Sequence, residues 1–171
     1  NTTGSQNTAV GYQALYTASG QINTTAIGYN TAFSATGSNL TAIGTQTFFG
    51  SSTGNDNTGV GVNVGYDNTS GSSLTGVGVE ALRRNTTGSN NNAFGRQALN
   101  ANTTGNYNNA VGEAALLSNT TGSSNIAMGG SALRANTTAS NNTAVGESAL
   151  RANTTGTGNT AIGNSAGTAI T

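Results

Sequence analysis

Residues 142–158 read Asn-Thr-Ala-Val-Gly-Glu-Ser-Ala-Leu-Arg-Ala-Asn-Thr-Thr-Gly-Thr-Gly, and the same pattern begins again at Asn159. When the chain is aligned on the small residue, apolar residue and glycine of this unit, the spacing is 17 residues throughout except for one step of 16. The aligned glycines are Gly11, Gly28, Gly44, Gly61, Gly78, Gly95, Gly112, Gly129, Gly146 and Gly163. A fixed period of this kind is typical of stacked repeats, so residues 1–171 are predicted to form a single repeat domain of ten repeats, a segment of a longer fibrous protein.

The unit favours strands over helices. The residue before each glycine is apolar and mostly β-branched, which suits a strand. These residues are Val10, Ile27, Ile43, Val60, Val77, Phe94, Val111, Met128, Val145 and Ile162. A second apolar pair follows three residues after the glycine, as in Ala81-Leu82, so two short strands per unit are expected. A 17-residue unit rich in Gly, Thr and Asn cannot supply leucine-rich or helical repeats. We therefore predict an all-β parallel β-solenoid (β-roll) with one coil per repeat and about ten coils.

The Asn-Thr-Thr-Gly segments are predicted to be the corners of the coils. They occupy residues 85–88, 102–105, 119–122 and 153–156. Glycine permits positive φ there, and Asn and Thr side chains can cap a turn. If each unit is one coil, coils stack at the ~4.8 Å strand spacing and make a rod on the order of 45–50 Å long.

The two faces of the strand differ in side-chain size. Alternation places the Val/Ile position on one face and the neighbouring Ala or Gly on the other. We predict that the Val/Ile row fills the core of the coil. The Ala/Gly row would then make a flat strip that another chain can approach, which suggests an oligomer, since a thin coil buries little apolar surface by itself.

Polar rows run beside the apolar ones. An asparagine row consists of Asn7, Asn57, Asn91, Asn108, Asn125, Asn142 and Asn159, and a threonine row of Thr8, Thr25, Thr41, Thr58, Thr75, Thr143 and Thr160. Stacked Asn amides can hydrogen-bond to each other as in cross-β ladders, so part of the asparagine row is expected inside. The threonine row shares a strand face with the Val/Ile row, and it is therefore expected to point inward as well.

Composition excludes several classes of function. Only 6% of residues are charged, and five arginines balance five acids. This composition lacks the basic stripe that binds nucleic acid or anionic lipid, and no stretch approaches the ~20 apolar residues of a membrane span. No nucleic-acid partner and no membrane insertion are predicted. The low charge also favours association with further copies of the chain.

The sequence contains neither histidine nor cysteine, so a catalytic triad, a thiol nucleophile and a zinc site lack their usual residues. We predict no catalytic residues, no cofactor and no metal site. Glu113 and Glu147 share a repeat position two coils apart, roughly 10 Å, which is the wide end for a glycosidase pair. Simple solvation of these acids is the alternative.

Arginines and tyrosines offer weaker candidates for binding. Arg96 and Glu113 are expected to form a surface ion pair, with an anion site as the alternative. Arg134 and Arg151, together with Arg83 and Arg84 earlier in the chain, either meet an acidic glycan or are solvated. The tyrosines do not predict a sugar-stacking platform. Formal N-glycosylation acceptors occur at Asn23, Asn68, Asn85, Asn102, Asn119, Asn136 and Asn153, although they recur simply because the repeat recurs.

The repeat resembles the head repeats of trimeric autotransporter adhesins, whose unit has a similar Asn-Thr/Ser-Ala-Ile-Gly core. Asn159-Thr-Ala-Ile-Gly163 and Asn7-Thr-Ala-Val-Gly11 match it closely, and the resemblance spans the chain, although the unit here is longer. Repeats of phage tail fibres and bacterial surface fibres are also similar. The resemblance implies a left-handed roll, three chains side by side, and an adhesive or receptor-reaching role.

The leading hypothesis is a non-catalytic structural or adhesive segment of an extracellular fibre, on a cell surface or a virion. It predicts self-association as a homotrimer or filament, with a host surface glycan or protein as a further candidate partner. A self-assembling extracellular filament is one alternative. The other is a binder of a flat lattice such as ice or crystalline polysaccharide, which would require the threonine row to be outward, flat and unpaired.

Overall fold

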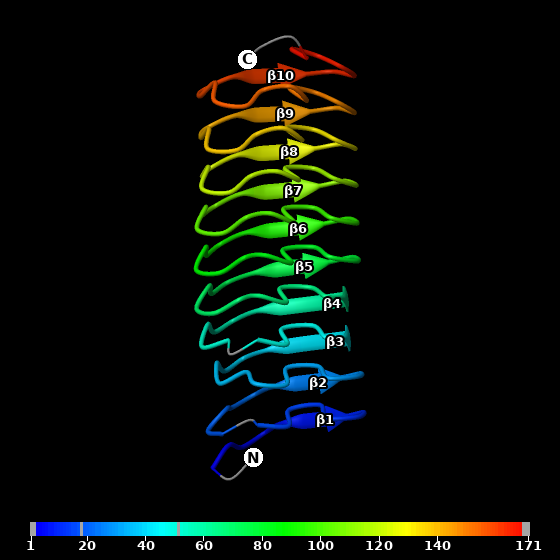
Figure 1. Ribbon diagram of the computed structural model, residues 1–171, viewed down its shortest axis with the longest axis vertical. Coiled ribbons are helices and arrows are strands. Elements are labelled where there is room, and N and C mark those ends of the chain that lie inside the picture. Colours follow the sequence, from blue (N-terminus) through cyan, green and yellow to red (C-terminus); the bar gives the residue numbers. More distant parts are fainter. Residues whose placement is uncertain (1–2, 18, 51, 169–171) are drawn as a thin grey trace.

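The chain winds into a parallel β-solenoid with one strand in each repeat (Figure 1). The computed structural model describes residues 3–17, 19–50 and 52–168. The strands are β1 (Thr8–Val10), β2 (Thr25–Ile27), β3 (Thr41–Thr45), β4 (Thr58–Val62), β5 (Thr75–Val77), β6 (Asn92–Phe94), β7 (Asn109–Val111), β8 (Ile126–Met128), β9 (Thr143–Val145) and β10 (Thr160–Ile162). They form one ten-stranded sheet in chain order, and no helix occurs in these ranges. The predicted fold class is confirmed.

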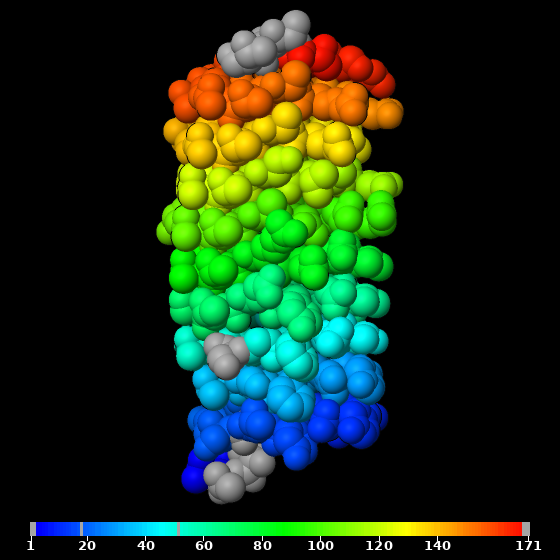
Figure 2. Space-filling model, in the orientation of Figure 1, coloured from blue at the N-terminus to red at the C-terminus, as the bar shows by residue number. Residues whose placement is uncertain are grey.

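Successive strands pair in register, so each repeat position stacks on the same position of the next coil. Thr8 pairs with Thr25 between β1 and β2, and Thr143 pairs with Thr160 between β9 and β10. The single 16-residue step keeps this register, since Thr25 of β2 pairs with Thr41 of β3. The product is a rod whose coils follow one another from the N-terminal end to the C-terminal end (Figure 2).

The second apolar pair of each unit forms a turn, so the prediction of a second strand is wrong. Glu80 and Leu82 have φ angles of 60° and 54°, and Gln97 and Leu99 repeat this with 58° and 51°. Left-handed residues cannot continue a strand and are each disfavoured by roughly 1–2 kcal/mol. Full burial of the leucine side chain contributes about 1.5–3 kcal/mol, which offsets a large part of the strain of the two left-handed residues.

The core is made by the small residue of each strand, and the prediction that the Val/Ile row fills the core is wrong. Strand alanines such as Ala93 are fully buried together with turn leucines such as Leu99. The residues predicted as core are instead exposed or half-buried, namely Val10, Ile27, Ile43, Val60, Val77, Phe94, Val111, Met128, Val145 and Ile162. The cause is space, because a Cβ added at the inward Gly76 would lie 2.5 Å from Val64 Cγ1 and 3.4 Å from Leu82 Cδ1. A thin coil accepts Ala or Gly there, so the Ala/Gly row is the interior lining and not an interface.

The aligned glycines are required for two reasons. Their φ angles, from Gly11 to Gly163, lie between +124° and +144°, a region that side chains other than glycine rarely adopt. From Gly11 to Gly146, an added Cβ would also lie 1.8–2.7 Å from the carbonyl oxygen of the aligned glycine in the next coil. The close approach of successive coils therefore depends on this row.

The corner glycines have a different role from the predicted one. Gly88 and Gly105 do not have positive φ; the left-handed residues lie two positions later, at Asn90 and Tyr107, both with φ of 59°. Glycine is needed at position 88 because a Cβ there would lie 2.3 Å from Gly105 O. Close stacking of corners, rather than an unusual backbone angle, explains the residue.

The predicted asparagine row contributes a buried column on one side of the coil. From Asn91 to Asn142 its members are fully buried, and Asn159 is half-buried at the end of the rod. Within this part of the row, each Oδ1 accepts the backbone N–H of the next member at 2.9–3.0 Å. Each Nδ2 also reaches a corner carbonyl, as in the 2.9 Å bond from Asn108 to Gly122 O. These bonds satisfy polar groups that no water reaches.

A second buried asparagine column lies at the corners. It consists of Asn68, Asn85, Asn102, Asn119, Asn136 and Asn153, all fully buried. From Asn85 onward, each Nδ2 donates to the Oδ1 of the preceding member at 2.8–3.2 Å. Every Nδ2 in the column also donates to the carbonyl three residues later at 2.9–3.0 Å. This column was expected only as turn caps and formal glycosylation acceptors, and in the folded rod its amide nitrogens are inaccessible to a glycan.

Candidate functional site

The most extensive candidate surface is the side of the sheet that faces solvent, which we call the outer face. It is formed by the third-residue row, which is the Val/Ile row, and by a first-residue row. The first-residue row is Thr8, Thr25, Thr41, Thr58, Thr75, Asn92, Asn109, Ile126, Thr143 and Thr160. Neither row contains a charged residue. Phe94 and Met128, near the middle of the rod, expose 41% and 46% of their surface.

The threonine row lies on this outer face, so the prediction that it points inward is wrong. The strand places the small residue inside, and its two neighbours must then point out. Thr25, Thr41, Thr58 and Thr75 are half-buried by their neighbours, and their hydroxyls make no hydrogen bond within the described ranges. In-register pairing stacks these hydroxyls at the ~4.8 Å strand spacing, next to a parallel row of apolar side chains.

The apolar strip is wider over the N-terminal coils. Tyr12 and Tyr29, one position after the aligned glycine, stack with ring centroids 5.4 Å apart and are 63% and 51% exposed. Val62 and Val79 continue this position and are also exposed. Beyond them the same position carries Arg96. The N-terminal half thus presents three adjacent uncharged rows.

A column of four aromatic rings lies on the turns of the N-terminal coils. Tyr16, Phe33, Phe49 and Tyr66 stack with centroid distances of 5.2, 5.2 and 5.1 Å. The column was not among the predictions from the sequence, although the spacings of 17, 16 and 17 residues between these four aromatic residues were the available signal. The faces of Phe33 and Phe49 are covered by neighbouring rings, so the column presents mainly ring edges rather than a platform for sugar stacking.

The charged residues form local contacts between coils. Arg96 Nη1 lies 2.9 Å from Glu113 Oε1, which confirms the predicted ion pair, and both side chains are more than half exposed. Such an exposed pair contributes little to stability.

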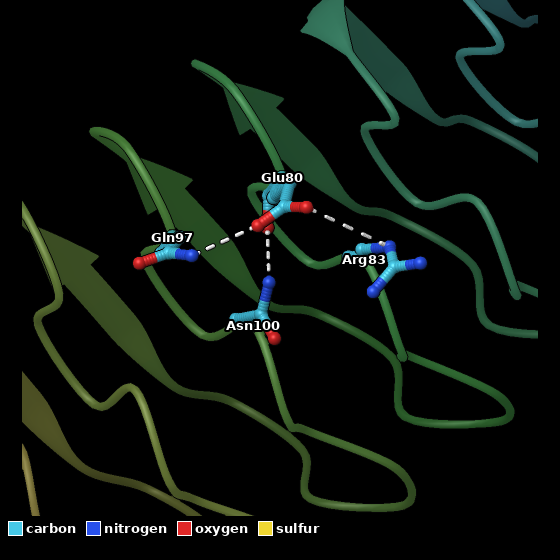
Figure 3. Close-up of polar contacts among 4 residues, drawn as sticks. All are labelled: Glu80, Arg83, Gln97 and Asn100. Atoms are coloured by element: carbon cyan, nitrogen blue, oxygen red, sulfur yellow. Dashed lines mark hydrogen bonds and ion pairs between the residues drawn. The ribbon is translucent and has the colours of Figure 1, made fainter.

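Glu80 binds residues of two coils (Figure 3). Gln97 Nε2 donates to Glu80 Oε2 at 2.9 Å, and Asn100 Nδ2 donates to Glu80 O at 3.1 Å. Arg83 Nε lies 4.0 Å from Glu80 Oε1. The carboxylate therefore has a role in tying neighbouring coils together.

The remaining predicted candidates gather near the C-terminal end. Glu113 and Glu147 line one hollow of about 400 Å³, together with Arg134 and Arg151. Both arginines also line a neighbouring hollow of about 600 Å³. Gly130 lies between Glu113 and Glu147 in the same repeat position. A Cβ added to Gly130 would have no atom within 4 Å, so the absence of a side chain there helps to open the smaller hollow.

Among the formal glycosylation acceptors, Asn23 differs from the buried corner column. It is exposed, and its Nδ2 donates to Asn39 Oδ1 at 3.1 Å. It lies at a left-handed position with φ of 57°.

Comparison of the chain with protein-family models, with curated proteins and with solved structures gave no match. Over residues 3–17, 19–50 and 52–168, no helix is long and apolar enough to cross a membrane. The same ranges hold no group of three or more Asp, Glu, His or Cys side chains placed to bind a metal ion.

Proposed function

We propose that the chain is a non-catalytic, rod-shaped segment of an extracellular fibre, on a cell surface or a virion, that assembles with further copies of itself and carries an adhesive or receptor-reaching end. The observation that carries this proposal is the outer face. Ten in-register strands present an uncharged row of Val, Ile, Phe and Met side chains to solvent. Contiguous apolar patches larger than a few hundred Å² mark interaction surfaces in soluble proteins.

The proposed assembly is a homotrimer of parallel rods with the outer faces turned toward a common axis. Burial of the exposed row that includes Val77, Phe94 and Met128 would supply the apolar surface that a single thin coil lacks. Both rows lack charge, so no like-charge repulsion opposes the contact. The resemblance to trimeric adhesin repeats supports the same stoichiometry.

The mass of the segment in solution tests this proposal. We expect light scattering to give three times the 16.8 kDa chain mass and negative-stain images to show short rods. The variant Val77→Asp/Val111→Asp places two carboxylates on the outer face, so it should be monomeric. The matched control Thr87→Asp/Thr104→Asp adds the same charge at exposed corners and should stay trimeric. A monomeric wild type contradicts the proposal, and long filaments favour the self-assembling alternative.

A flat-lattice binder is the second candidate, and it is supported by a threonine row that points outward, whose hydroxyls from Thr25 to Thr75 have no hydrogen-bond partner among the described residues. Regular hydroxyl and methyl groups at a fixed spacing can match ice or a crystalline polysaccharide. If the wild type is monomeric, we expect it to inhibit ice recrystallisation or adsorb to crystalline cellulose. Thr58→Lys, at the centre of the unpaired run, should abolish that activity, whereas Thr87→Lys at a corner should retain it. Failure of the monomer to adsorb to either solid excludes this candidate.

A further inference from the structure

We infer that the C-terminal coils bind an acidic polysaccharide through a groove centred on Arg134 and Arg151. The two arginines hold the same repeat position in adjacent coils. Their backbone is fixed by the coil-to-coil bonds from Ser118 N to Arg134 O at 3.1 Å and from Ala135 N to Arg151 O at 3.0 Å. Consecutive guanidinium groups therefore start one coil apart, at about the 4.8 Å strand spacing.

The groove beside these arginines is lined by small and hydroxylated residues. Its volume is about 600 Å³, and besides the arginines and alanines its walls are Ser118, Ser148, Ser165 and Thr168. Among the described residues that line it there is no carboxylate and no aromatic ring. Its walls therefore offer positive charge and hydrogen-bonding groups beside the methyl and methylene groups of the alanine and arginine side chains.

The polar groups of the groove are not engaged elsewhere in the fold. Arg83 and Arg96 each have a carboxylate partner, whereas Arg134 and Arg151 make no ion pair or side-chain hydrogen bond within the described part of the chain. The hydroxyls of Ser118 and Ser148 likewise make no hydrogen bond there, although that of Ser165 bonds to Asn164 Oδ1 at 2.9 Å. Both arginines are exposed, so their donors face solvent.

The acidic residues of the adjoining smaller hollow determine on which side of Arg134 and Arg151 an anion binds more favourably. Its acids are Glu113, which is paired with Arg96, and Glu147, which has no ion-pair partner among the described residues. Glu147 repels an anion from that hollow and leaves the serine-lined side as the favourable one.

These groups fit a sulfated or carboxylated sugar chain. Guanidinium groups bind the oxygens of sulfate and carboxylate through paired, charge-assisted hydrogen bonds. Serine and threonine hydroxyls exchange hydrogen bonds with sugar hydroxyls. Two cations at the coil spacing suit acidic groups on neighbouring units of a polymer.

This inference deepens the proposed adhesive function and depends on it only for the extracellular setting. The lining residues of the larger groove belong neither to β1–β10 nor to the row directly after the aligned glycines, so this groove is separate from the outer face, whereas the smaller hollow borders it. Assembly through the outer face and binding in the groove can therefore be tested separately.

Binding of soluble polymers provides the test, with dextran sulfate, polygalacturonate, uncharged dextran and the acidic peptide polyglutamate as probes. Arg134→Gln/Arg151→Gln should weaken binding of at least one acidic polymer about tenfold or more, because both charge-assisted hydrogen-bond donors to the anion are lost. Arg83→Gln/Arg84→Gln removes the same charge elsewhere and should change affinity less than about twofold. Glu147→Gln removes the nearby repulsion and should tighten binding.

The outcomes separate the possible sources of the signal. Preference for dextran sulfate identifies sulfate esters, and preference for polygalacturonate identifies carboxylates. Equal losses in the two double arginine variants, binding of uncharged dextran as tight as that of the acidic polymers, or tighter binding of polyglutamate would each overturn the inference. Light scattering of Arg134→Gln/Arg151→Gln should still give the wild-type mass, so loss of assembly and loss of polymer binding are told apart.

Discussion

The coils from β5 to β9 repeat the same buried residues, whereas the first four coils fill the same interior differently. At the turn, the coils from β5 to β9 bury Leu82, Leu99, Leu116, Leu133 and Leu150 in one column. The corresponding residues of the first four coils are Leu15, Ala32, Phe48 and Gly65. Both parts keep the same strand register and the same glycine row. The glycine-centred backbone therefore defines the coil, and the interior tolerates more than one filling.

In the first four coils, the side chain of Phe48 occupies space that small neighbouring residues leave empty. Phe48 is fully buried. A Cβ added to Gly65 would lie 2.4 Å from Phe48 Cε1, and one added to Gly59 would lie 2.8 Å from Phe48 Cε2. The Phe48 ring thus fills the volume that the strand alanine and the turn leucine of the following coil occupy elsewhere.

The two halves also differ in how completely they satisfy buried amides. Leu40 and Leu74 stand in the first asparagine column, and neither can accept a hydrogen bond through its side chain. The backbone N–H groups of the next members, Asn57 and Asn91, make no hydrogen bond in the described part of the chain. From Asn108 onward each such N–H has an asparagine acceptor.

The glycine row provides the largest expected effect and should not distinguish the halves. Gly112→Ala and Gly44→Ala place a Cβ 2.6 Å and 1.8 Å from the next coil, at φ of +131° and +125°. We expect each to lower the free energy of unfolding by about 4 kcal/mol or more, measured by chemical denaturation followed by circular dichroism. Gly130→Ala, with nothing within 4 Å of its Cβ, is the control and should be nearly neutral. Similar stabilities for Gly112→Ala and Gly130→Ala would show that close coil stacking is not the constraint.

The packing around Phe48 tests whether the irregular interior is compensated. Gly65→Leu alone should destabilise by about 3 kcal/mol, because the new side chain overlaps the ring. Adding Phe48→Leu should restore the leucine column and recover part of that loss. A double-mutant cycle by denaturation should give a coupling energy of about 1–3 kcal/mol. Additive effects would mean that the two positions are filled independently.

Reciprocal swaps test the asparagine column. Asn108→Leu removes the acceptor of Asn125 N, and we expect a loss of about 2 kcal/mol from one unsatisfied buried amide. Leu74→Asn supplies an acceptor for Asn91 N while giving up apolar burial, so its change should stay within about 1 kcal/mol. Denaturation midpoints of both variants, compared at equal protein concentration, measure the difference. Equal losses of stability in the two variants would mean that leucine at position 108 is disfavoured as strongly as asparagine at position 74.

The smallest expected effect concerns the charged residues at the position after the aligned glycine, which only the C-terminal half carries. Arg96→Gln should change the free energy of unfolding by less than about 0.5 kcal/mol, because the side chains of Arg96 and Glu113 are both exposed. A cycle with Glu113→Gln at low and high salt isolates the pair energy. A coupling above about 1 kcal/mol, insensitive to salt, would contradict this assignment.

The period of the sequence was enough to predict the solenoid and the stacking of repeats, because in-register parallel pairing requires only that equivalent residues recur. It was not enough to decide which side of the strand is inside. An apolar Val77 beside a Gly76 suggests a core residue, but the opposite wall of the coil, formed by Val64 and Leu82, leaves room only for the smaller one. That wall is a tertiary property, so strand alternation alone could not reveal it.

The candidate surfaces were predicted unevenly for similar reasons. The pair of Arg96 and Glu113 followed directly from the 17-residue spacing. The aromatic column was missed because Tyr16 and Tyr66 are separated by phenylalanines and by the shortened coil. The corner asparagines, such as Asn102, resemble surface turn residues, and their burial depends on the stacking of identical amides in neighbouring coils.

Because every coil bonds only to the coil before it and the coil after it, the length of this molecule is set by copy number. Duplication of a 17-residue block, as unequal recombination between similar gene segments produces, would add one coil and about 4.8 Å of reach without altering any other contact. Excision of a block would shorten it by the same step. The C-terminal coils, with nearly identical interiors, are the part in which such changes cost least, so they are the natural place for the rod to be lengthened over evolutionary time.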